Sequence, residues 1–358
     1  MIRLGVLFGG RSGEHEISLM SATSVINAID RDKYEVVKIG ITREGEWYLF
    51  DGPAEDIENG SWEAAAKEAL SAHPDKYRLN ILGTGGDSLK NRMDFALPIL
   101  HGPYGEDGTI QGLFEMTGIP YGGSGVTGSA LTMDKILAKA VFGNAGLPQG
   151  PYVAFTKAEY DKEGPQLLGL IEKRLSYPLF VKPANMGSSV GINKVRNCEE
   201  LKKAIEEAAI YDNRLLAEEG IDCRELEVAV LGNSSPEVSG VGEIIPSREF
   251  YDYTAKYFDD GKSLLCIPAD ISEDKAREIR LIAAEAYKLL DCSGYARVDC
   301  FMEKSTGKIL LNEINTIPGF TKYSMFPLLW GEAGISYKDL IERIVGLGYE
   351  RYNAKNSR

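Results

Sequence analysis

The sequence predicts an α/β fold with more than one domain, and with an α+β character in its C-terminal part. The first ~130 residues alternate short apolar runs with helical patterns, while a β-hairpin pattern marks the second half. At 358 residues the chain is also longer than one domain of roughly 100–200 residues. Hydrophobic residues make up 44% and charged residues 26%, so the chain can bury a large core without disulfides.

The N-terminal part predicts a parallel sheet. Apolar runs indicate strands at 3–8, 35–41, 94–100 and, more briefly, 119–121. Helical patterns cover 18–29, with Ser18 as the expected cap, and 62–72. Strands that alternate with helices in this way favour a sheet covered by helices on both faces.

A Gly/Ser-rich stretch at 122–129 predicts the first domain boundary. The segments predicted after it are helices at 132–144, 165–175 and 198–210, and strands at 151–155, 178–183 and 214–218. A hinge-like Glu218 to Gly220 follows them. We therefore expect domains at 1–128, 129–221 and 222–358.

The last part combines a long loop with a helix and a hairpin. A strand is expected at 225–231, a helix at 273–290 capped by Ser272, and a hairpin of strands 295–302 and 308–315. The stretch 246–265 is polar and aromatic without a clear period. Its length predicts a mobile functional loop.

Charge and composition limit the partners. The net charge is −13, from 40 basic and 53 acidic residues, which argues against nucleic acid or an anionic membrane as the main partner. A few placed lysines could still hold a nucleotide. The N-terminus has no signal-peptide pattern, and no apolar stretch is long enough for a membrane helix. Five cysteines without CxxC spacing predict reduced thiols in a cytoplasmic protein.

The hairpin carries the sharpest chemical signal. Alternation puts Arg297 and Asp299 on one face of the first strand, and Glu313 and Asn315 together on the second. Three oxygen ligands and an arginine would then converge, and carboxylate and amide oxygens suit Mg²⁺ shared with phosphates. The alternative is a solvated salt-bridge face. A following turn that contains Gly319 favours a site.

A second signal is Lys182, which ends an apolar strand and precedes a loop with two glycines and two serines. Such loops can offer backbone N–H groups to phosphates, although Gly/Ser loops are also common connectors and no Walker A motif exists. Lys135, Lys139 and Lys256 are, taken alone, more often surface residues.

Other familiar motifs are missing from the sequence. The loop at 9–16 lacks GxGxxG spacing, which disfavours a dehydrogenase. The three histidines, His15, His73 and His101, are far apart and form no HExxH pattern, so zinc chemistry is not expected. There is no GxSxG elbow.

Taken together, segments from nearly the whole chain resemble the D-alanine–D-alanine ligases of the ATP-grasp superfamily. In chain order these segments are Gly9-Gly10 with Glu14 to Ser18, His101 to Gly112, Met133-Asp134-Lys135, Lys182-Pro183 with Gly187 to Gly191, Tyr251 to Tyr257, Arg297-Val298-Asp299, and Asn312 to Thr321. Each is weak alone, but their combination in this order is highly specific. The resemblance implies an N-terminal parallel-sheet pre-ATP-grasp domain, a two-lobed ATP-grasp fold and a homodimer.

The resemblance also implies a reaction for peptidoglycan precursor synthesis. ATP would phosphorylate the carboxylate of one D-alanine, and the amine of a second would attack the D-alanyl phosphate. D-alanyl-D-alanine, ADP and phosphate would be released. ATP and two Mg²⁺ (or Mn²⁺) ions are expected.

The roles that the resemblance implies fall into three groups. Those for ATP and metal are Lys135, Lys182 and Lys256 on phosphates, Glu218, Glu219, Gly220 and Ile221 at the adenine hinge, Glu225 on the ribose, and Asp299, Glu313 and Asn315 on the metals. Those for the first D-alanine are Glu14 on its ammonium group, Ser188 and Tyr257 linking Glu14 to the mobile loop, and Arg297 with the Gly319 N–H as oxyanion donors. Those for the acceptor are Ser324 on its carboxylate, with His101 and Met325 nearby.

Single residues bear on the choice of acceptor substrate, and three other functions are alternatives to this ligase activity. Tyr257 favours an amino-acid acceptor over D-lactate, and relatives that accept D-serine tend to have arginine where this chain has Met325. Tyr323 departs from the Thr-x-His-Ser of many members. The rivals are another ATP-grasp ligase that activates a different carboxylate, a nucleotide-binding module without catalysis, and a purely structural α/β protein.

Overall fold

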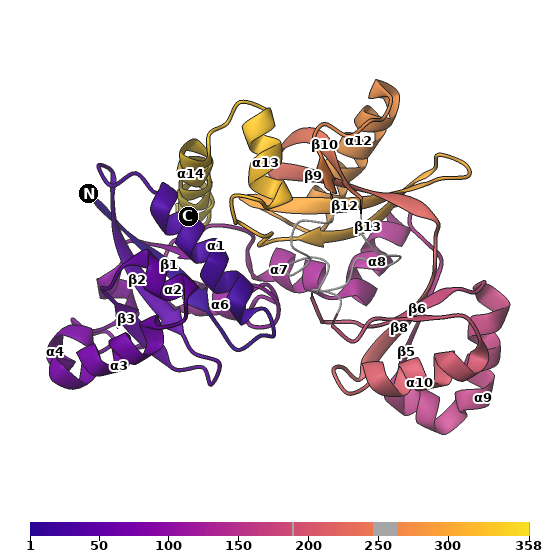
Figure 1. Ribbon diagram of the computed structural model, residues 1–358, viewed down its shortest axis with the longest axis horizontal. Helices are drawn as coiled ribbons and strands as arrows, with labels where there is room; N and C mark the ends of the chain where they lie inside the picture. Colours follow the sequence, from indigo (N-terminus) through magenta and orange to yellow (C-terminus); the bar gives the residue numbers. More distant parts are fainter. Residues whose placement is uncertain (188–189, 246–263, 358) are drawn as a thin grey trace.

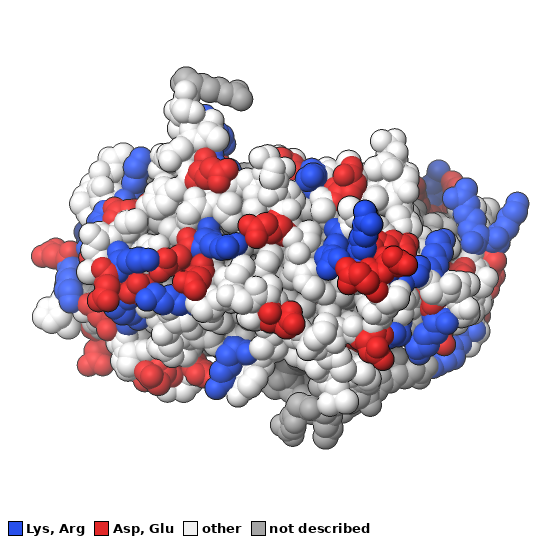
Figure 2. Space-filling model, turned by 90° about the horizontal axis from the view of Figure 1, so that it is seen from above, with Lys and Arg blue, Asp and Glu red and all other residues white. Residues whose placement is uncertain are grey.

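The computed structural model of the protein describes residues 1–187, 190–245 and 264–357. These residues contain three sheets, and the sheet with strands β9 to β13 lies between the other two (Figure 1). No helix among them is both long enough and apolar enough to cross a membrane. The face drawn in Figure 2 mixes acidic and basic side chains.

The first sheet has the strand order β3-β2-β1-β4. Its strands are β1 (Ile2–Gly9), β2 (Tyr34–Ile41), β3 (Trp47–Phe50) and β4 (Phe95–Pro98). The three predicted strands β1, β2 and β4 are parallel, as expected, but the sequence missed β3, which pairs with β2 in antiparallel orientation. The short strand predicted at 119–121 is a single bridge between Ala96 and Tyr121.

Helices cover both faces of the first sheet, as predicted. The helices are α1 (His15–Ala28), α2 (Ala54–Glu58), α3 (Trp62–Ala72), α4 (Pro74–Tyr77), α5 (Leu89–Arg92) and α6 (Thr109–Thr117). Alternation along β1 sends Leu4 and Val6 into one core with α1 and α3, whereas Leu7 packs with Phe114 of α6 on the opposite face.

The expected cap of the first helix is wrong. Helix α1 begins at His15, and Glu14 precedes it. The Ser18 hydroxyl instead accepts a hydrogen bond from the Gly9 N–H at 2.8 Å and donates to the carbonyl of Ile99. Ser18 is fully buried and links β1 to the segment after β4, so its polar side chain satisfies backbone groups rather than starting a helix.

Two helices follow one another from the predicted boundary at 122–129 onwards, where the sequence predicted one. Helix α7 (Val126–Met133) begins inside it, and α8 (Lys135–Asn144) replaces the single helix expected at 132–144. Asp134 separates the two with an extended backbone, and its carboxylate accepts hydrogen bonds from the N–H groups of Ile136 and Leu137. This N-cap starts α8 and fixes the direction of Lys135.

The second sheet is antiparallel and has the order β5-β8-β6-β7. It comprises β5 (Tyr152–Thr156), β6 (Leu179–Pro183), β7 (Asn193–Val195) and β8 (Arg214–Glu219), covered by α9 (Lys157–Arg174) and α10 (Cys198–Ala208). The sequence missed β7 and the first turns of α9. That helix starts at a capping box of Thr156 and Glu159, and its kink at Glu163 precedes Pro165.

The third sheet contains the predicted hairpin. Its order is β11-β10-β9-β12-β13, with β9 (Cys223–Leu231), β10 (Glu237–Ile245), β11 (Leu264–Cys266), β12 (Tyr295–Glu303) and β13 (Ile309–Asn315). The sequence missed β10. Residues 246–263 of the predicted loop lie outside the described residues, whereas Leu264 and Leu265 are strand residues, which corrects the loop's end. Helix α12 (Glu273–Leu289) packs on this sheet and is capped by Ser272, as expected.

Two unpredicted helices, α13 (Met325–Glu332) and α14 (Tyr337–Asn356), end the chain. Leu340 and Ile344 of α14 pack in the same core as Leu4 and Phe95 of the first sheet. That core continues through Phe326 of α13 to the third sheet. The domain limits at 128 and 221 therefore remain a prediction, because α14 follows the third sheet in sequence but packs on the first.

Candidate active site

The hairpin brings together the polar residues predicted from its alternation. Arg297 lies opposite Asn315 and Asp299 opposite Glu313, so the four side chains share one face. The Arg297 guanidinium donates to both carboxylate oxygens of Asp299 at 2.7 Å, and the Asn315 amide lies 3.1 Å from one of them. A carboxylate oxygen of Glu227, on β9, also lies 3.1 Å from the Arg297 Nε.

The chemistry of this donor set suits a hard cation. Among the described residues, no three His, Cys, Asp or Glu side chains gather in a metal-holding arrangement. The hairpin offers two carboxylates, Asp299 and Glu313, and the amide of Asn315. Mg²⁺ is commonly held by one or two carboxylates, with water and substrate phosphates completing its shell. The residues therefore fit a metal that is shared with a nucleotide.

A buried lysine pair surrounds Glu218 at the end of β8. Lys182 of β6 donates to one Glu218 oxygen at 2.7 Å, and Lys139 of α8 is 3.3 Å from the other. Burial alone would raise the pKa of Glu218, but attraction to Lys139 and Lys182 outweighs it and lowers the pKa to about 2. Lys139 is 4% exposed. From the sequence alone, Lys139 could not be told from a surface lysine, because no pattern around it showed that it faces the core.

Lys182 also lies in the field of two further predicted residues. Burial alone would lower its pKa, but Glu218 first, and then Glu313 and Glu225, raise it. Strands β6, β8, β9 and β13 thus bring four charged residues together, namely Lys182, Glu218, Glu225 and Glu313. A cation surrounded in this way stays charged at neutral pH and can attract a phosphate.

Lys135, at the start of α8, contacts the loop after β6. Its backbone N–H donates to the carbonyl of Ala184 at 3.1 Å and its ammonium group to the carbonyl of Met186 at 2.6 Å. The loop that the sequence linked to phosphate binding is therefore fastened to a predicted phosphate ligand. Ser188, which follows in this loop, lies outside the described residues.

The predicted hinge is fixed by its own backbone and side chains. The Gly220 N–H donates to the carbonyl of Pro178 at 2.7 Å, and Glu219 accepts from the N–H of Ser176 at 2.8 Å. A β-carbon on Gly220 would lie 2.8 Å from the carbonyl oxygen of Pro178, so a larger residue would separate the strands. Ile221 then leads into β9, and its side chain lies next to Gly150.

Glu14 lies where the N-terminal part meets the loop after β6. It is 7% exposed, and its N–H donates to the hydroxyl of Ser12. A β-carbon on Gly102 would lie 2.5 Å from a Glu14 carboxylate oxygen, and one on Gly187 would lie 2.7 Å from the same oxygen. Both glycines therefore allow the backbone to approach this carboxylate closely, and the loop after β6 reaches the N-terminal part there.

His101 joins the N-terminal part to the turn after the hairpin. Its Nδ1 is 2.9 Å from the carbonyl of Ile317, so Nδ1 carries the proton and donates. Burial lowers the pKa of His101 and outweighs the opposing effect of Glu14. The ring is therefore neutral at pH 7. The sequence placed His101 near the substrates but gave no partner for it.

Glu106 is a site residue that the sequence did not single out. Its carboxylate accepts from the N–H of Gly102 at 2.7 Å and from the N–H of Ile317 at 3.1 Å. Removal from water, and then repulsion by Glu14, raise the pKa of Glu106 to about 8. Its position in the motif from His101 to Gly112 was the available signal, but no periodicity connects it to residue 317.

The predicted acceptor residues follow this turn. The Ser324 hydroxyl is 2.8 Å from that of Thr321 and accepts from the Thr321 N–H, and a β-carbon on Gly319 would lie 2.9 Å from the Ser324 oxygen. Met325 is 4% exposed. Tyr323 is 72% exposed, so its side chain is largely in contact with solvent.

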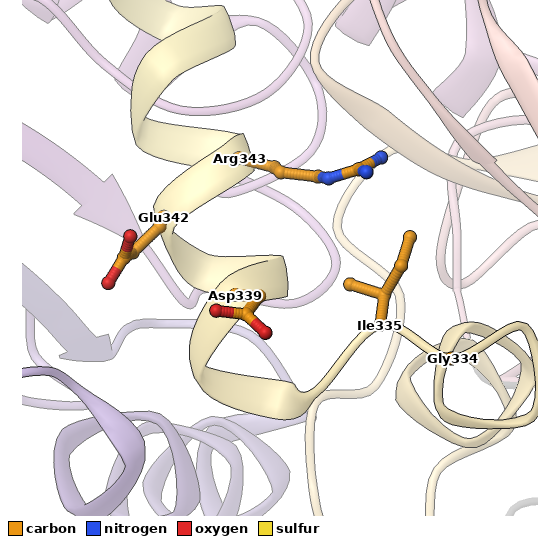
Figure 3. Close-up of a pocket in the computed structure, with 5 residues that line it drawn as sticks. All are labelled: Gly334, Ile335, Asp339, Glu342 and Arg343. Atoms are coloured by element: carbon orange, nitrogen blue, oxygen red, sulfur yellow. The ribbon is translucent and has the colours of Figure 1, made fainter.

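The part of the chain that the structure describes also has cavities away from the charged cluster. One of about 480 Å³ is lined by residues at the start of α14 and the connection before it, among them Asp339, Glu342 and Arg343 (Figure 3). None of its lining residues is a predicted site residue. A second cavity of about 260 Å³ borders the loops at Gly10 and Gly105. We assign the chemistry to the charged cluster because the predicted residues meet there.

The comparisons with known proteins now bear on this cluster. Residues 3–124 match the model for the D-ala D-ala ligase N-terminus, and residues 141–346 match that for the D-ala D-ala ligase C-terminus. The chain belongs to the D-alanine–D-alanine ligase family. This confirms the resemblance drawn from the motifs.

Relatives of the family cover the whole chain. A D-alanine–D-alanine ligase of Thermoanaerobacter sp. (strain X514) is 53% identical over 355 residues, which are 99% of this chain and 98% of the relative. The solved structure of VanG, a D-Ala:D-Ser ligase of Enterococcus faecalis, has a TM-score of 0.83 at 38% identity and covers 97% of this chain and 99% of its own. A Bacillus anthracis D-alanine–D-alanine ligase in complex with ATP has a TM-score of 0.73 at 26% identity, covering 99% and 100%. These neighbours confirm the ATP-grasp type of mixed α/β fold.

The roles of individual residues stay predictions. Lys182 interacts with Glu218, Glu225 and Glu313 at one end of the cluster, and His101 with Glu14 and Arg297 at the other. Lys256 and Tyr257 lie outside the described residues, as does Ser188.

Proposed function

We propose that this enzyme joins two D-alanines to D-alanyl-D-alanine at the expense of ATP, for peptidoglycan precursor synthesis. The observation that carries the proposal is the meeting of the Arg297–Asp299 hairpin with Glu14, His101 and the lysine pair around Glu218. A nucleotide end and an amino-acid end adjoin in one cluster. The identity to D-alanine–D-alanine ligases over the full chain supports the substrate.

At the nucleotide end, Lys135 and Lys182 would bind phosphates of ATP, and the stretch from Glu218 to Ile221 would hold the adenine. Lys182 already lies among carboxylates, so a phosphate would compete with Glu218 for it. Asp299, Glu313 and Asn315 would hold two Mg²⁺ or Mn²⁺ ions. Bound metal would offset the repulsion between ATP phosphates and an incoming carboxylate.

At the amino-acid end, Glu14 would bind the ammonium group of the first D-alanine. Its burial makes that ion pair strong, since water screens it little. The carboxylate of this D-alanine attacks the γ-phosphorus of ATP and displaces ADP. Arg297 would stabilise the resulting D-alanyl phosphate. The Gly319 N–H would donate, together with Arg297, to the carbonyl oxygen of this intermediate.

The second D-alanine would lie against Ser324, whose hydroxyl would hold its carboxylate. Its neutral amine attacks the acyl phosphate, a tetrahedral intermediate forms, and phosphate leaves. Met325 is buried and apolar, which suits the methyl group of D-alanine better than a hydroxyl. D-Alanine is therefore the proposed acceptor, although VanG is a D-Ala:D-Ser ligase.

We expect a homodimer, as the family resemblance implies, with domains at 1–128, 129–221 and 222–358. All five cysteines are free thiols, which is consistent with the reducing cytoplasm where ATP is supplied.

The direct test measures ADP release with MgATP and D-alanine, then with added D-lactate or D-serine, and identifies the products by mass. D-alanyl-D-alanine with little mixed product is expected. Predominantly mixed product would change the acceptor, and no turnover with any D-amino acid would overturn the proposal.

The variant Glu14→Gln separates this substrate from a different carboxylate. It should abolish most D-alanine turnover while ADP binding stays unchanged, because Glu14 lies at the amino-acid end. Normal dipeptide synthesis by this variant would exclude the proposed role of Glu14.

A further inference from the structure

We infer that Glu106 is a positioning residue, whose carboxylate bridges the backbone N–H groups of Gly102 and Ile317 and thereby aligns the turn at 316–320. This turn contains Gly319, the proposed oxyanion donor. The inference rests on the proposed function. It adds Glu106 to the residues whose roles in ATP, metal or substrate binding were proposed above.

The bridge joins segments that are distant in sequence. Glu106 lies between β4 and α6, and Ile317 follows the hairpin 211 residues later. One carboxylate oxygen accepts from the Ile317 N–H at 3.1 Å and the other from the Gly102 N–H at 2.7 Å. Each oxygen of a carboxyl group can accept a hydrogen bond, so one side chain satisfies both donors at once. An amide would turn its NH₂ group towards one of them.

The same turn has two further attachments to the N-terminal part. The Ile317 carbonyl accepts from His101, and the Phe320 N–H lies 3.3 Å from the Ser21 hydroxyl oxygen. Ser21 in turn lies 3.2 Å from Nε2 of His101 and donates to it. Residues 317 and 320 are therefore tethered on either side of Gly319.

Aromatic packing holds the other side of the turn. The Phe320 ring contacts Tyr295 edge-on at 5.7 Å and Phe326 at 5.3 Å between ring centroids. The ring and the backbone tethers thus act from opposite sides. A turn held in this way can present the Gly319 N–H in one direction without reorganising during the reaction.

The electrostatic surroundings show that a charge at this place is costly. Burial and then repulsion by Glu14 disfavour the ionised form of Glu106, whereas the two N–H donors and Arg297 favour it, and the balance raises the pKa of Glu106 to about 8. Tyr295, also buried nearby, has its pKa raised by its own burial and by Glu106. With a pKa of about 8 the side chain is mostly protonated at pH 7, and each of its two oxygens keeps acceptor capacity for one N–H group. The amide nitrogen of a glutamine has no such capacity, which explains why a carboxyl group stands here.

The test compares Glu106→Gln with Glu115→Gln as the matched control. Glu115 lies on α6 and accepts from Tyr121 and Lys355, away from the turn. In Glu106→Gln, kcat for D-alanyl-D-alanine should fall by about 10-fold or more, since loss of a whole oxyanion donor typically costs ~10²–10³. KM for ATP should stay within about twofold, because the lysine pair is separate.

A second readout does not depend on turnover. Amide hydrogen exchange of the peptide that covers 316–320 should be faster in Glu106→Gln and unchanged in Glu115→Gln. The variant Ser21→Ala removes the tether at Phe320 and should show the same pattern, with kcat reduced and KM for ATP retained, even if Glu106→Gln does not fold.

The outcomes separate the two proposals. Wild-type kcat and exchange in both Glu106→Gln and Ser21→Ala would overturn the inference. A lower kcat with unchanged exchange at 316–320 would overturn it as well, because the turn would not be what Glu106 controls. If the wild type made no dipeptide, the proposed function would fail, while the exchange comparison would still decide whether Glu106 holds the turn.

Discussion

The two ends of the candidate site are built by different interactions. At the nucleotide end, Lys139 and Lys182 share the buried carboxylate of Glu218, so charge holds the site together. At the amino-acid end, Glu106 and His101 reach the backbone of Ile317 across 211 and 216 residues of sequence. Substitutions at the first end should therefore change binding and stability, and those at the second end should change rate.

The largest effect is expected for Arg297→Met, at the centre of the amino-acid end. It removes the proposed oxyanion donor and leaves the carboxylates of Asp299 and Glu227 without the guanidinium that both of them contact. We expect kcat to fall by ~10²–10³ with ADP binding preserved. Steady-state kinetics and calorimetric ADP titration would measure both.

Arg297→Lys serves as its comparison. The lysine keeps the charge but cannot contact both oxygens of Asp299 as the guanidinium does. Its kcat should therefore exceed that of Arg297→Met only slightly. Full activity in the lysine variant would show that charge alone suffices at this end.

The next effect concerns Glu218 and acid stability. The pKa of Glu218 lies at about 2, below its ordinary value of 4.5, because attraction to the two lysines exceeds the effect of burial. The stabilisation is thus complete above about pH 4.5 and is lost as the pH falls towards 2, and it amounts to about 3 kcal/mol.

Glu218→Gln should remove this contribution. Urea unfolding at pH 7 and pH 3 should show a lower stability at pH 7 and a smaller drop between the two pH values than in the wild type. Parallel losses in both proteins would mean that the lysine pair does not set the acid dependence.

A smaller effect is expected for Lys139→Met. If Lys182 turns to an ATP phosphate, Lys139 remains as the counter-charge of Glu218, so its loss should weaken ADP binding about 10-fold, or ~1.4 kcal/mol. The exposed Lys173 provides the control, and Lys173→Met should bind ADP like the wild type. Equal affinities in both variants would exclude a role for Lys139.

The smallest effect is expected for Tyr323→Ala. The side chain is 72% exposed, and its removal should change kcat and KM for D-alanine by less than about twofold. A larger change in either constant would place Tyr323 in the acceptor site and reduce the contrast between the two ends.

Local patterns predicted much of the fold. Alternation fixed the hairpin and its four polar residues, and the apolar runs located the parallel strands of the first sheet. Patterns failed where a side chain serves a distant partner. Ser18 looked like a cap because its acceptor, the carbonyl of Ile99, lies 81 residues away.

The site divides in the same way. Lys182 and the hinge could be predicted because strand ends and glycines mark them in sequence. Lys139 and Glu106 could not, because their importance depends on which helix face is buried and on which turn folds back to residue 102. Long-range contacts of this kind leave no periodic signal.

The return of α14 to the first sheet bears on how the chain is made. During synthesis, β1 and β4 leave the ribosome long before Leu340 and Ile344, which share their core. The apolar surface around Leu4 and Phe95 must therefore wait, partly uncovered, for almost the whole chain to be translated. The core of the first sheet is therefore complete only when α14 has been made. A nascent chain that stalls before Tyr337 exposes an apolar surface of the kind that chaperones bind.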